Sequence, residues 1–211
     1  MSHTAEPAGS RQAQKLRTRQ ALLSASLELL ERQSLGSLGL REVTRAAGLS
    51  PAAFYRHFAD IPALGVALVD EALESLHGMI GAILAETGDT ERRIERSVEL
   101  IARHVAEQPA HFRFVARERY GAVEPVRTAI AAQLDRFAEE LTRVLAADAG
   151  AHGWSGADLR MLGGMYVDLM VMTSSEFLEA TGPGPRAEAA HTARRRLRLL
   201  AVGSAHWLDE D

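Results

Sequence analysis

Apolar residues recur every three or four positions through most of this chain, which is the spacing of one face of an α-helix. In the first such stretch, residues 12–33, Leu16, Leu23 and Leu30 fall on one stripe. The further stretches cover residues 40–47, 51–58, 60–86, 90–108, 109–120, 125–147, 157–180 and 186–208. The pattern predicts an all-α protein of about nine helices.

A sharp turn separates the two short stretches. Gly48 can adopt a positive φ where the first helix ends, Ser50 can cap the next helix, and Pro51 suits its first position because no intrahelical donor is lost there. Phe54 and Phe58, four residues apart, are expected to face a small core. The side chains expected on the remaining surface are those of Ala52, Ala53, Tyr55, Arg56 and His57. This arrangement predicts a helix-turn-helix.

The surface of the second helix suits contact with DNA. Ala52 and Ala53 are small enough to let the backbone approach the major groove, where an alanine methyl can meet a thymine methyl. Tyr55, Arg56 and His57 are donors suited to phosphate oxygens. The plainer interpretation, an ordinary amphipathic helix, does not account for a turn, a cap and a proline in register.

Charge is distributed unevenly along the chain, whose net charge is −4. Residues 1–58 contain eight Lys and Arg and four Asp and Glu, a net charge of +4, so the rest has −8. Lys15 and Arg17 lie in the early turns of the first helix, the unfavourable end for cations in the helix dipole. Either the DNA backbone or a solvated face would explain them. A basic end on an acidic body is typical of a protein that binds phosphate at one end.

Several functional classes are disfavoured by composition. The chain has no cysteine, which excludes disulfides, thiolate metal sites and cysteine nucleophiles. Its N-terminus lacks the apolar segment of a secretion signal, and its longest apolar run, residues 161–172, is too short to cross a bilayer. We expect a cytoplasmic protein without membrane insertion.

The sequence contains no recognisable catalytic set. Its serines lack a nearby His and Asp partner, and no glycine-rich loop could cradle phosphate. We expect no enzyme, no cofactor and no metal site. Convergence of His77, His104 and His111 on a ligand or metal is the weaker hypothesis, because histidine is common on half-buried helix faces.

The run Gly-x-Ser-x-x-x-Phe-Tyr-x-His-Phe at residues 48–58, after an Arg-Glu-Val helix, resembles the signature of the TetR family of one-component transcriptional regulators. The resemblance implies a homodimer on palindromic double-stranded operator DNA. It also implies phosphate contacts at Tyr55 and His57, and positions at or near the bases for Thr44, Arg45, Ala52 and Ala53. The full set of expected DNA-binding residues is Lys15, Arg17, Thr44, Arg45, Ser50, Ala52, Ala53, Tyr55, Arg56 and His57.

Two positions depart from the family pattern. Gly39 stands where a Ser or Thr usually caps the first helix of the motif, and glycine is a tolerable cap. Ala59 replaces a frequent basic residue, which removes one phosphate contact.

We expect a disordered lead at residues 1–10, a DNA-binding domain at 11–59, and a ligand-binding and dimerisation domain at 60–211. The helix at residues 157–180 is apolar nearly all round, so its second side needs a partner chain or a ligand. Gly163 and Ala193 are among the small residues that would let helices approach closely. As the resemblance implies, we expect the last two helices to form the dimer interface, a four-helix bundle.

Residues 37–71 and 111–121, and more faintly 197–210, are similar to one branch of the family, the repressors of unsaturated fatty-acid synthesis and acyl-CoA desaturation. The similarity implies long-chain acyl-CoA, or another acyl thioester, as the effector. An acyl chain needs an apolar slot between helices. The candidates for that slot are Met79, Ile83, Ile101, Val105, Phe112, Val115, Met165, Tyr166 and Leu169.

The charged head of such an effector needs cations near the mouth of the slot, for which Arg113, Arg117 and Arg119 are candidates. These arginines lie on different helix faces, so we expect at least one to pair with an acid instead. Two alternatives stay open: a TetR-type repressor of a drug or another apolar ligand, and a helical acyl-thioester carrier or enzyme without a DNA function.

Overall fold

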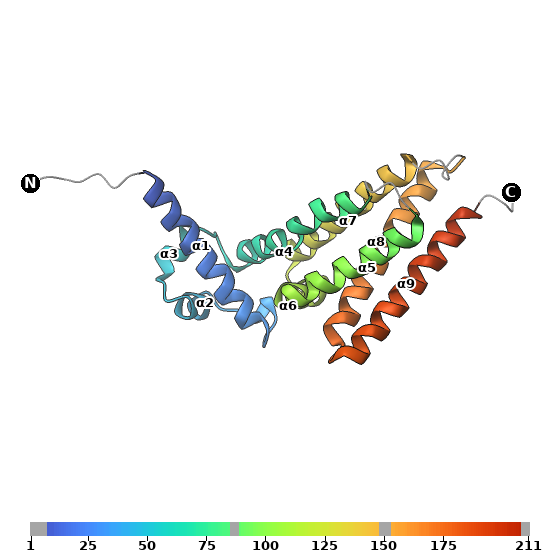
Figure 1. Ribbon diagram of the computed structural model, residues 1–211. Helices are drawn as coiled ribbons and strands as arrows, with labels where there is room; N and C mark the ends of the chain where they lie inside the picture. The colour runs from blue at the N-terminus through green and yellow to red at the C-terminus, as the bar shows by residue number, and fades with distance from the viewer. Residues whose placement is uncertain (1–7, 85–88, 148–152, 208–211) are drawn as a thin grey trace, which may run out of the picture.

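The computed structural model describes residues 8–84, 89–147 and 153–207, without the side chains at 8–10, 75 and 78–84. These residues form nine α-helices and one short 3₁₀ helix, η1, with no strand (Figure 1). The elements are α1 (Ala8–Leu30), η1 (Leu35–Ser37), α2 (Leu40–Ala46), α3 (Pro51–Tyr55), α4 (Ile61–Leu84), α5 (Thr90–Glu107), α6 (Pro109–Glu118), α7 (Glu124–Ala147), α8 (Gly156–Glu179) and α9 (Pro183–Ala205). The all-α prediction is confirmed.

The first helix begins earlier than the sequence pattern predicts. α1 starts at Ala8, so residues 8–10 of the expected disordered lead are helical, and residues 1–7 lie outside the described part of the chain. Alanine, arginine and glutamine near this end are good helix formers, which lets the helix extend beyond its apolar stripe.

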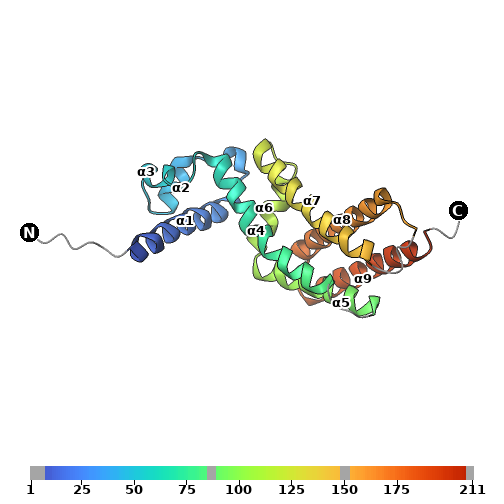
Figure 2. The same ribbon diagram turned by 90° about the horizontal axis from the view of Figure 1, so that it is seen from above.

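The helices form an elongated molecule with α1, α2 and α3 at one end (Figures 1 and 2). α4 leaves this end and packs against α7, which in turn packs against α8. α9 lies against α5 and α8 at the opposite end of the molecule from α3. Within the described residues, none of the helices has the length and apolar content needed to span a membrane.

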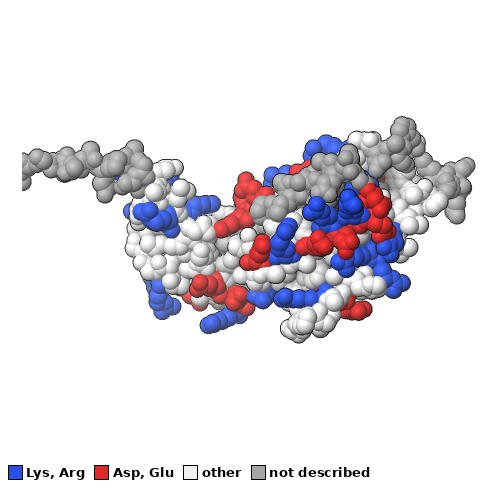
Figure 3. Space-filling model, viewed as in Figure 1, with Lys and Arg blue, Asp and Glu red and all other residues white. Residues whose placement is uncertain are grey.

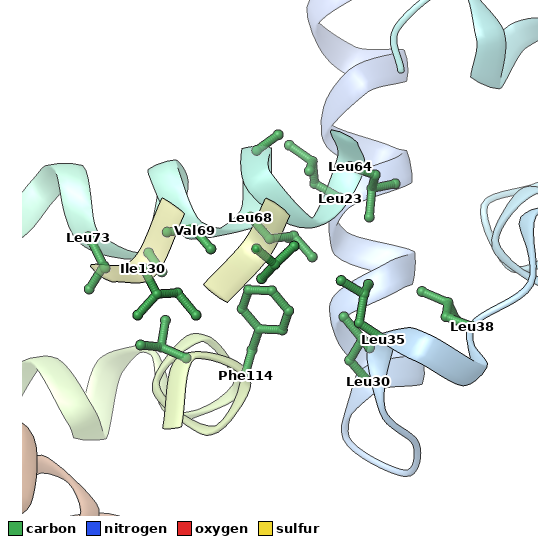
Figure 4. Packing of buried hydrophobic residues seen from close by; sticks show 14 of the residues in the cluster. Leu23, Leu30, Leu35, Leu38, Leu64, Leu68, Val69, Leu73, Phe114 and Ile130 are labelled. Carbon is green, nitrogen blue, oxygen red and sulfur yellow. The ribbon is translucent and has the colours of Figure 1, made fainter. Parts of the chain in front are cut away.

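One buried cluster extends from the α1–α3 end into the larger helical part (Figure 4). Leu30 of α1 and Leu35 of η1 belong to the same cluster as Leu68 of α4, Phe114 of α6 and Ile130 of α7. Because packed interiors transmit strain, a displacement of α4 or α6 is expected to act on the helix-turn-helix end.

A second buried cluster joins α5, α8 and α9. It contains Val98 of α5, Phe177 of α8 and Ala193 of α9. Tyr166 and Met170 of α8 pack against both clusters, so α8 connects the two cores.

Candidate functional site

The predicted turn between α2 and α3 is confirmed. Gly48 has φ +66°, and the Leu49 N–H donates to the Thr44 carbonyl at 2.8 Å, which closes the end of α2. Ser50 then caps α3, because its Oγ accepts a hydrogen bond from the Ala53 N–H at 3.2 Å. The turn therefore sets where α3 starts.

The outer surface of the helix-turn-helix carries most of the side chains that were predicted to contact DNA. Arg45, Ala52, Tyr55 and Arg56 are exposed and His57 is half-buried. On the face shown in Figure 3, the charged side chains at the outer end of the α1–α3 part are basic, and acidic ones appear toward and over the larger part. This end of the molecule suits an anionic partner.

The first helix brings its cations next to α3. Burial, and then the nearby charges of Lys15, Arg19 and Arg56, lower the pKa of His57 below its usual value. The Arg19 guanidinium also lies 4.7 Å from the centre of the Phe58 ring. Arg19 is absent from the predicted DNA-binding set, although its place in the run with Lys15 and Arg17 was a usable signal. Arg17 is exposed and donates to Gln14 at 2.7 Å.

Two predicted DNA-binding side chains are buried, and for Ala53 the expected placement on the surface is wrong. Ala53 is 4% exposed and Thr44 is 3% exposed. The Thr44 hydroxyl donates to the Leu40 carbonyl at 3.1 Å within its own helix. Both side chains are buried within the helix-turn-helix, so a small or hydrogen-bonded side chain suits each position. The Ser50 hydroxyl, although exposed, is used in capping α3.

A cavity lies among the five helices from α4 to α8, with a volume of about 70 Å³ for the centres of water-sized molecules. Its walls are apolar apart from Ser174 and Ser175, whose hydroxyls donate to carbonyls of their own helix at 2.9 and 3.2 Å. The lining residues are Leu73, Leu76, Leu100, Ile101, Phe112, Val115, Ala116, Leu134, Phe137, Val167, Met170, Val171, Ser174, Ser175 and Leu178. No charged group is available inside for an ionic ligand.

The cavity contains three of the nine predicted apolar ligand residues, Ile101, Phe112 and Val115. Met165 is instead 47% exposed, because α8 turns it away from the face that carries Val167 and Met170. The side chains of Met79 and Ile83 lie outside the described residues.

The remaining predicted ligand residues are near the cavity but do not line it. Val105 faces a groove between α5 and α9. Tyr166 lines a separate hollow near Trp154, and burial raises the pKa of its phenol. Leu169 packs against the second buried cluster. The sequence pattern missed Leu134 and Phe137 of α7, whose only signal was an ordinary apolar stripe, and from α4 it selected Met79 and Ile83 but not the lining residues Leu73 and Leu76.

The three arginines of the segment 111–121 are not among the residues that line the cavity, and their place near its mouth stays a prediction. Arg113 forms an ion pair with Glu31 of the α1 end at 2.9 Å, which confirms that one arginine pairs with an acid. Arg117 donates to the carbonyls of Leu30 and Gln33 at 2.6 and 2.7 Å. The last carbonyls of a helix have no intrahelical partner, and a guanidinium satisfies them well.

Arg119 lies over the ring of Tyr120, with its guanidinium carbon 4.9 Å from the ring centre. It is not among the residues that line the cavity.

Glu118 completes the contact between α6 and the first helix. Its side chain is 1% exposed, and its Oε1 accepts a hydrogen bond from the Leu35 N–H at 3.0 Å. Gly121 leaves room for the carboxyl group, since a Cβ at that position would lie 2.3 Å from Glu118 Oε2. We call Arg113, Arg117 and Glu118, with their partners at residues 30–35, the α6–α1 joint. Sequence reasoning missed Glu118, which stands between two arginines in a polar run.

His77 is held between α4 and α7. Its Nδ1 lies 3.0 Å from Glu140 Oε1 and its Nε2 lies 2.9 Å from Gln133 Oε1, while its ring stacks on Phe137 at 3.8 Å. Gln133 in turn donates to Asp70 at 3.0 Å. Within the described chain, no three histidine, aspartate or glutamate side chains come close enough together to hold a metal ion.

Residues 22–68 match the model of the family described as bacterial regulatory proteins, tetR family. The match extends from α1 through the helix-turn-helix into the first turns of α4.

Solved structures share the fold. A candidate TetR-family transcriptional regulator from Syntrophomonas wolfei superposes with a TM-score of 0.73 at 17% identity, over 89% of this chain and 96% of that one. The regulator FadR from Bacillus subtilis, in complex with stearoyl-CoA, gives 0.68 at 13% identity, over 84% and 96%. NalD from Pseudomonas aeruginosa, the secondary repressor of the MexAB-OprM multidrug efflux pump, gives 0.67 at 19% identity, over 89% and 96%.

At these identities the likeness shows a shared fold, and the family match to residues 22–68 supplies the family of the helix-turn-helix part. Residues 22–68 therefore match the helix-turn-helix part of the tetR family, and the chain as a whole shares its fold with solved structures of TetR-family regulators.

Proposed function

We propose that this chain is a dimeric repressor that binds a palindromic operator and responds to an effector with a long apolar chain, an acyl-CoA or related thioester, to control fatty-acid desaturation and other lipid genes. One observation carries the proposal. α6 lines the apolar cavity with Phe112 and Val115, and on another face it holds the end of α1 through the α6–α1 joint. A ligand that displaces α6 therefore acts on the helix-turn-helix.

The chemistry of the cavity favours a hydrocarbon chain. Apolar walls without a charged group suit an acyl tail, and the thioester head has to stay outside them. Met170 in the wall can adapt to a bent or a straight chain. The likeness in fold to FadR, which was crystallised with stearoyl-CoA, supports the same class of effector.

The small size of the cavity explains how binding of the effector can change the arrangement of the helices. At about 70 Å³ it is far smaller than the roughly 300–1,000 Å³ of typical ligand pockets. An acyl chain can enter only if helices around the cavity move apart. The effector then binds the widened arrangement more tightly than the narrow one, and this difference in affinity is what can shift the DNA-binding equilibrium.

On DNA, we propose that α3 enters the major groove. Lys15 and Arg19 of α1, with Tyr55, Arg56 and His57, contact phosphates, and Arg45 and Ala52 lie toward the base edges. Each protomer reads one half-site, so two copies must present their α3 helices about 34 Å apart or at a multiple of that spacing.

The test is binding of the purified protein to a fluorescent fragment of its own upstream DNA, followed by titration with saturated and unsaturated long-chain acyl-CoA. CoA without an acyl chain is the control. We expect operator binding that both thioesters change by different amounts and that CoA alone leaves unchanged. Absence of specific DNA binding would refute the repressor. Specific binding indifferent to both thioesters would refute the effector class.

A second candidate is a repressor that responds to a drug or another uncharged apolar compound. The observation in its favour is the absence of any charged group among the residues that line the cavity. Operator release by an uncharged hydrophobic compound, with no effect of acyl-CoA, would support it.

A further inference from the structure

The outer face of α8 carries a stripe of exposed methionines. Met161, Met165 and Met172 are between 42% and 47% exposed, and their spacing of four and seven residues places them on one side of the helix. Asp168 is exposed and falls in the same stripe. We call these four residues the methionine stripe. An apolar stripe of this kind, interrupted by one acid, is unusual for a helix face that stays in water.

The outer face of α9 carries a complementary pattern. Leu199 and Val202 are 74% and 53% exposed, and Arg195 shares their side of the helix. α9 thus presents apolar residues with one cation among them.

Arg195 differs from its neighbours in its contacts. Arg194 pairs with Glu95 of α5 at 3.3 Å, and Arg196 pairs with Glu176 of α8 at 2.6 Å. Among the described residues, neither Arg195 nor Asp168 has a hydrogen bond or an ion pair. Two opposite charges thus stand unpaired on neighbouring apolar faces.

Asp168 and Arg195 also lie at the same height on the molecule. Asp168 is 11 residues before the end of α8 at Glu179, and Arg195 is 12 residues after the start of α9 at Pro183. α8 and α9 are antiparallel neighbours joined by a short turn, so equal distances from the turn mean equal heights. Both residues are near the middle of their helices.

We propose that a second copy of this chain covers the methionine stripe, and that Asp168 forms an ion pair with Arg195 of the partner subunit. By two-fold symmetry the pair occurs twice in the dimer. Asp168 and Arg195 of the partner subunit come to the same height whether the two-fold axis runs along the helices or across their middle, because either rotation returns mid-height residues to mid-height. The inference rests on the dimer of the proposed function and adds what fixes its register.

The two parts of this surface have different roles. The methionines supply apolar contact that tolerates imperfect fit. The charges disfavour other registers of the two protomers, because a shift by one helical turn would bury Asp168 among apolar side chains without an oppositely charged partner. The arrangement therefore selects one register and favours pairing with an identical chain.

The test is a charge swap in the full-length chain, read as the dimer dissociation constant from sedimentation equilibrium. The variants are Asp168→Arg, Arg195→Asp and the double swap. Each single change places like charges opposite each other twice per dimer, and we expect it to weaken dimerisation at least about tenfold. The double swap restores opposite charges, and we expect its constant to return to within about threefold of the starting chain.

Matched controls are Asp135→Arg and Arg143→Asp, the same charge changes at exposed positions of α7, which should leave the dissociation constant unchanged. Thermal melting by circular dichroism checks the fold of every variant. Should a reversed charge prevent folding, Asp168→Asn and Arg195→Gln give a milder test, in which combining the two should weaken the dimer no more than either alone.

Single swaps that dimerise like the α7 controls, or a folded double swap that stays as weak as the single ones, would overturn the ion pair while leaving the dimer intact. A monomeric unmodified chain at micromolar concentration would overturn the dimer of the proposed function itself.

Discussion

Replacing Glu118 by alanine should destabilise the protein and uncouple its two ends. The side chain is almost completely buried, and its Oε1 is the acceptor for the Leu35 N–H at 3.0 Å. The substitution removes this hydrogen bond, leaves a buried donor unsatisfied and opens a small void. An orphaned buried donor costs about 1–3 kcal/mol, and the void adds about 1 kcal/mol, so we expect a loss of about 2–4 kcal/mol in the free energy of unfolding.

Two further variants separate the causes. Glu118→Gln keeps an oxygen acceptor at the same place, so it should cost less than the alanine variant. Gly121→Ala keeps Glu118 but adds a Cβ that would lie 2.3 Å from Glu118 Oε2, which is too close. The Glu118 carboxyl group then has to move away from the Leu35 N–H, so this variant should lose much of the same free energy of unfolding.

Urea unfolding measured by circular dichroism gives the free energies, with Glu139→Ala, an exposed glutamate of α7, as the control. Effector titrations of the DNA complex measure how much the effector changes operator affinity. This change should be smaller in Glu118→Ala, while the affinity of the free protein for the effector is retained. The reasoning would be refuted by a Glu118→Ala protein within about 0.5 kcal/mol of the control, the usual range for surface substitutions.

Three other predictions concern separate parts of the molecule. Burial, and then the charges of Lys15, Arg19 and Arg56, hold the pKa of His57 below its usual 6.5 in the free protein, whereas DNA phosphates would raise it. Operator affinity should therefore increase as the pH falls through 6.5, because the complex takes up a proton, while the free energy of unfolding of the free protein should fall because the folded state binds fewer protons than the unfolded one. His57→Gln should flatten both profiles in anisotropy and unfolding measurements. Ala116→Leu fills part of the cavity and should weaken effector binding at least about tenfold in calorimetry, whereas Ala132→Leu on the exposed side of α7 should not. Gly48→Ala forces a side chain into φ +66° and should lower the free energy of unfolding by about 1–2 kcal/mol. The matched control is Gly203→Ala inside α9, where the φ is not positive and a Cβ would meet open space, and it should cause no such loss.

The elements of this fold were predictable because their signals are local. The cap at Ser50, the positive φ at Gly48 and the apolar periodicity all act within a few residues. The orientation of each helix face is not local. Arg113 and Arg117 share a face in any helical reading, but nothing in the sequence shows that the open carbonyl end of α1 lies opposite them.

The same limit explains why only some of the apolar residues that line the cavity could be predicted. α8 is apolar nearly all round, so its period does not reveal which side meets the cavity, and Met165 was assigned to the wrong side. Small residues were equally ambiguous. Gly163 faces α7, where a Cβ would lie 2.6 Å from Thr142 Oγ1, and Ala193 belongs to the cluster shared with α5. Both serve packing within the protomer, and the candidate dimer surface is the methionine stripe instead.

The single core that joins α1 and η1 to α4, α6 and α7 limits how this chain can be recombined with its relatives. A helix-turn-helix excised near residue 59 would leave Leu30 and Leu35 without the Phe114 side of their packing, so it is not a portable module. A chimaera that takes its DNA specificity from another regulator has to inherit the matching face of α6 as well. The two halves are therefore expected to have diverged together, as one unit of descent, with substitutions near residues 30–35 compensated in α6.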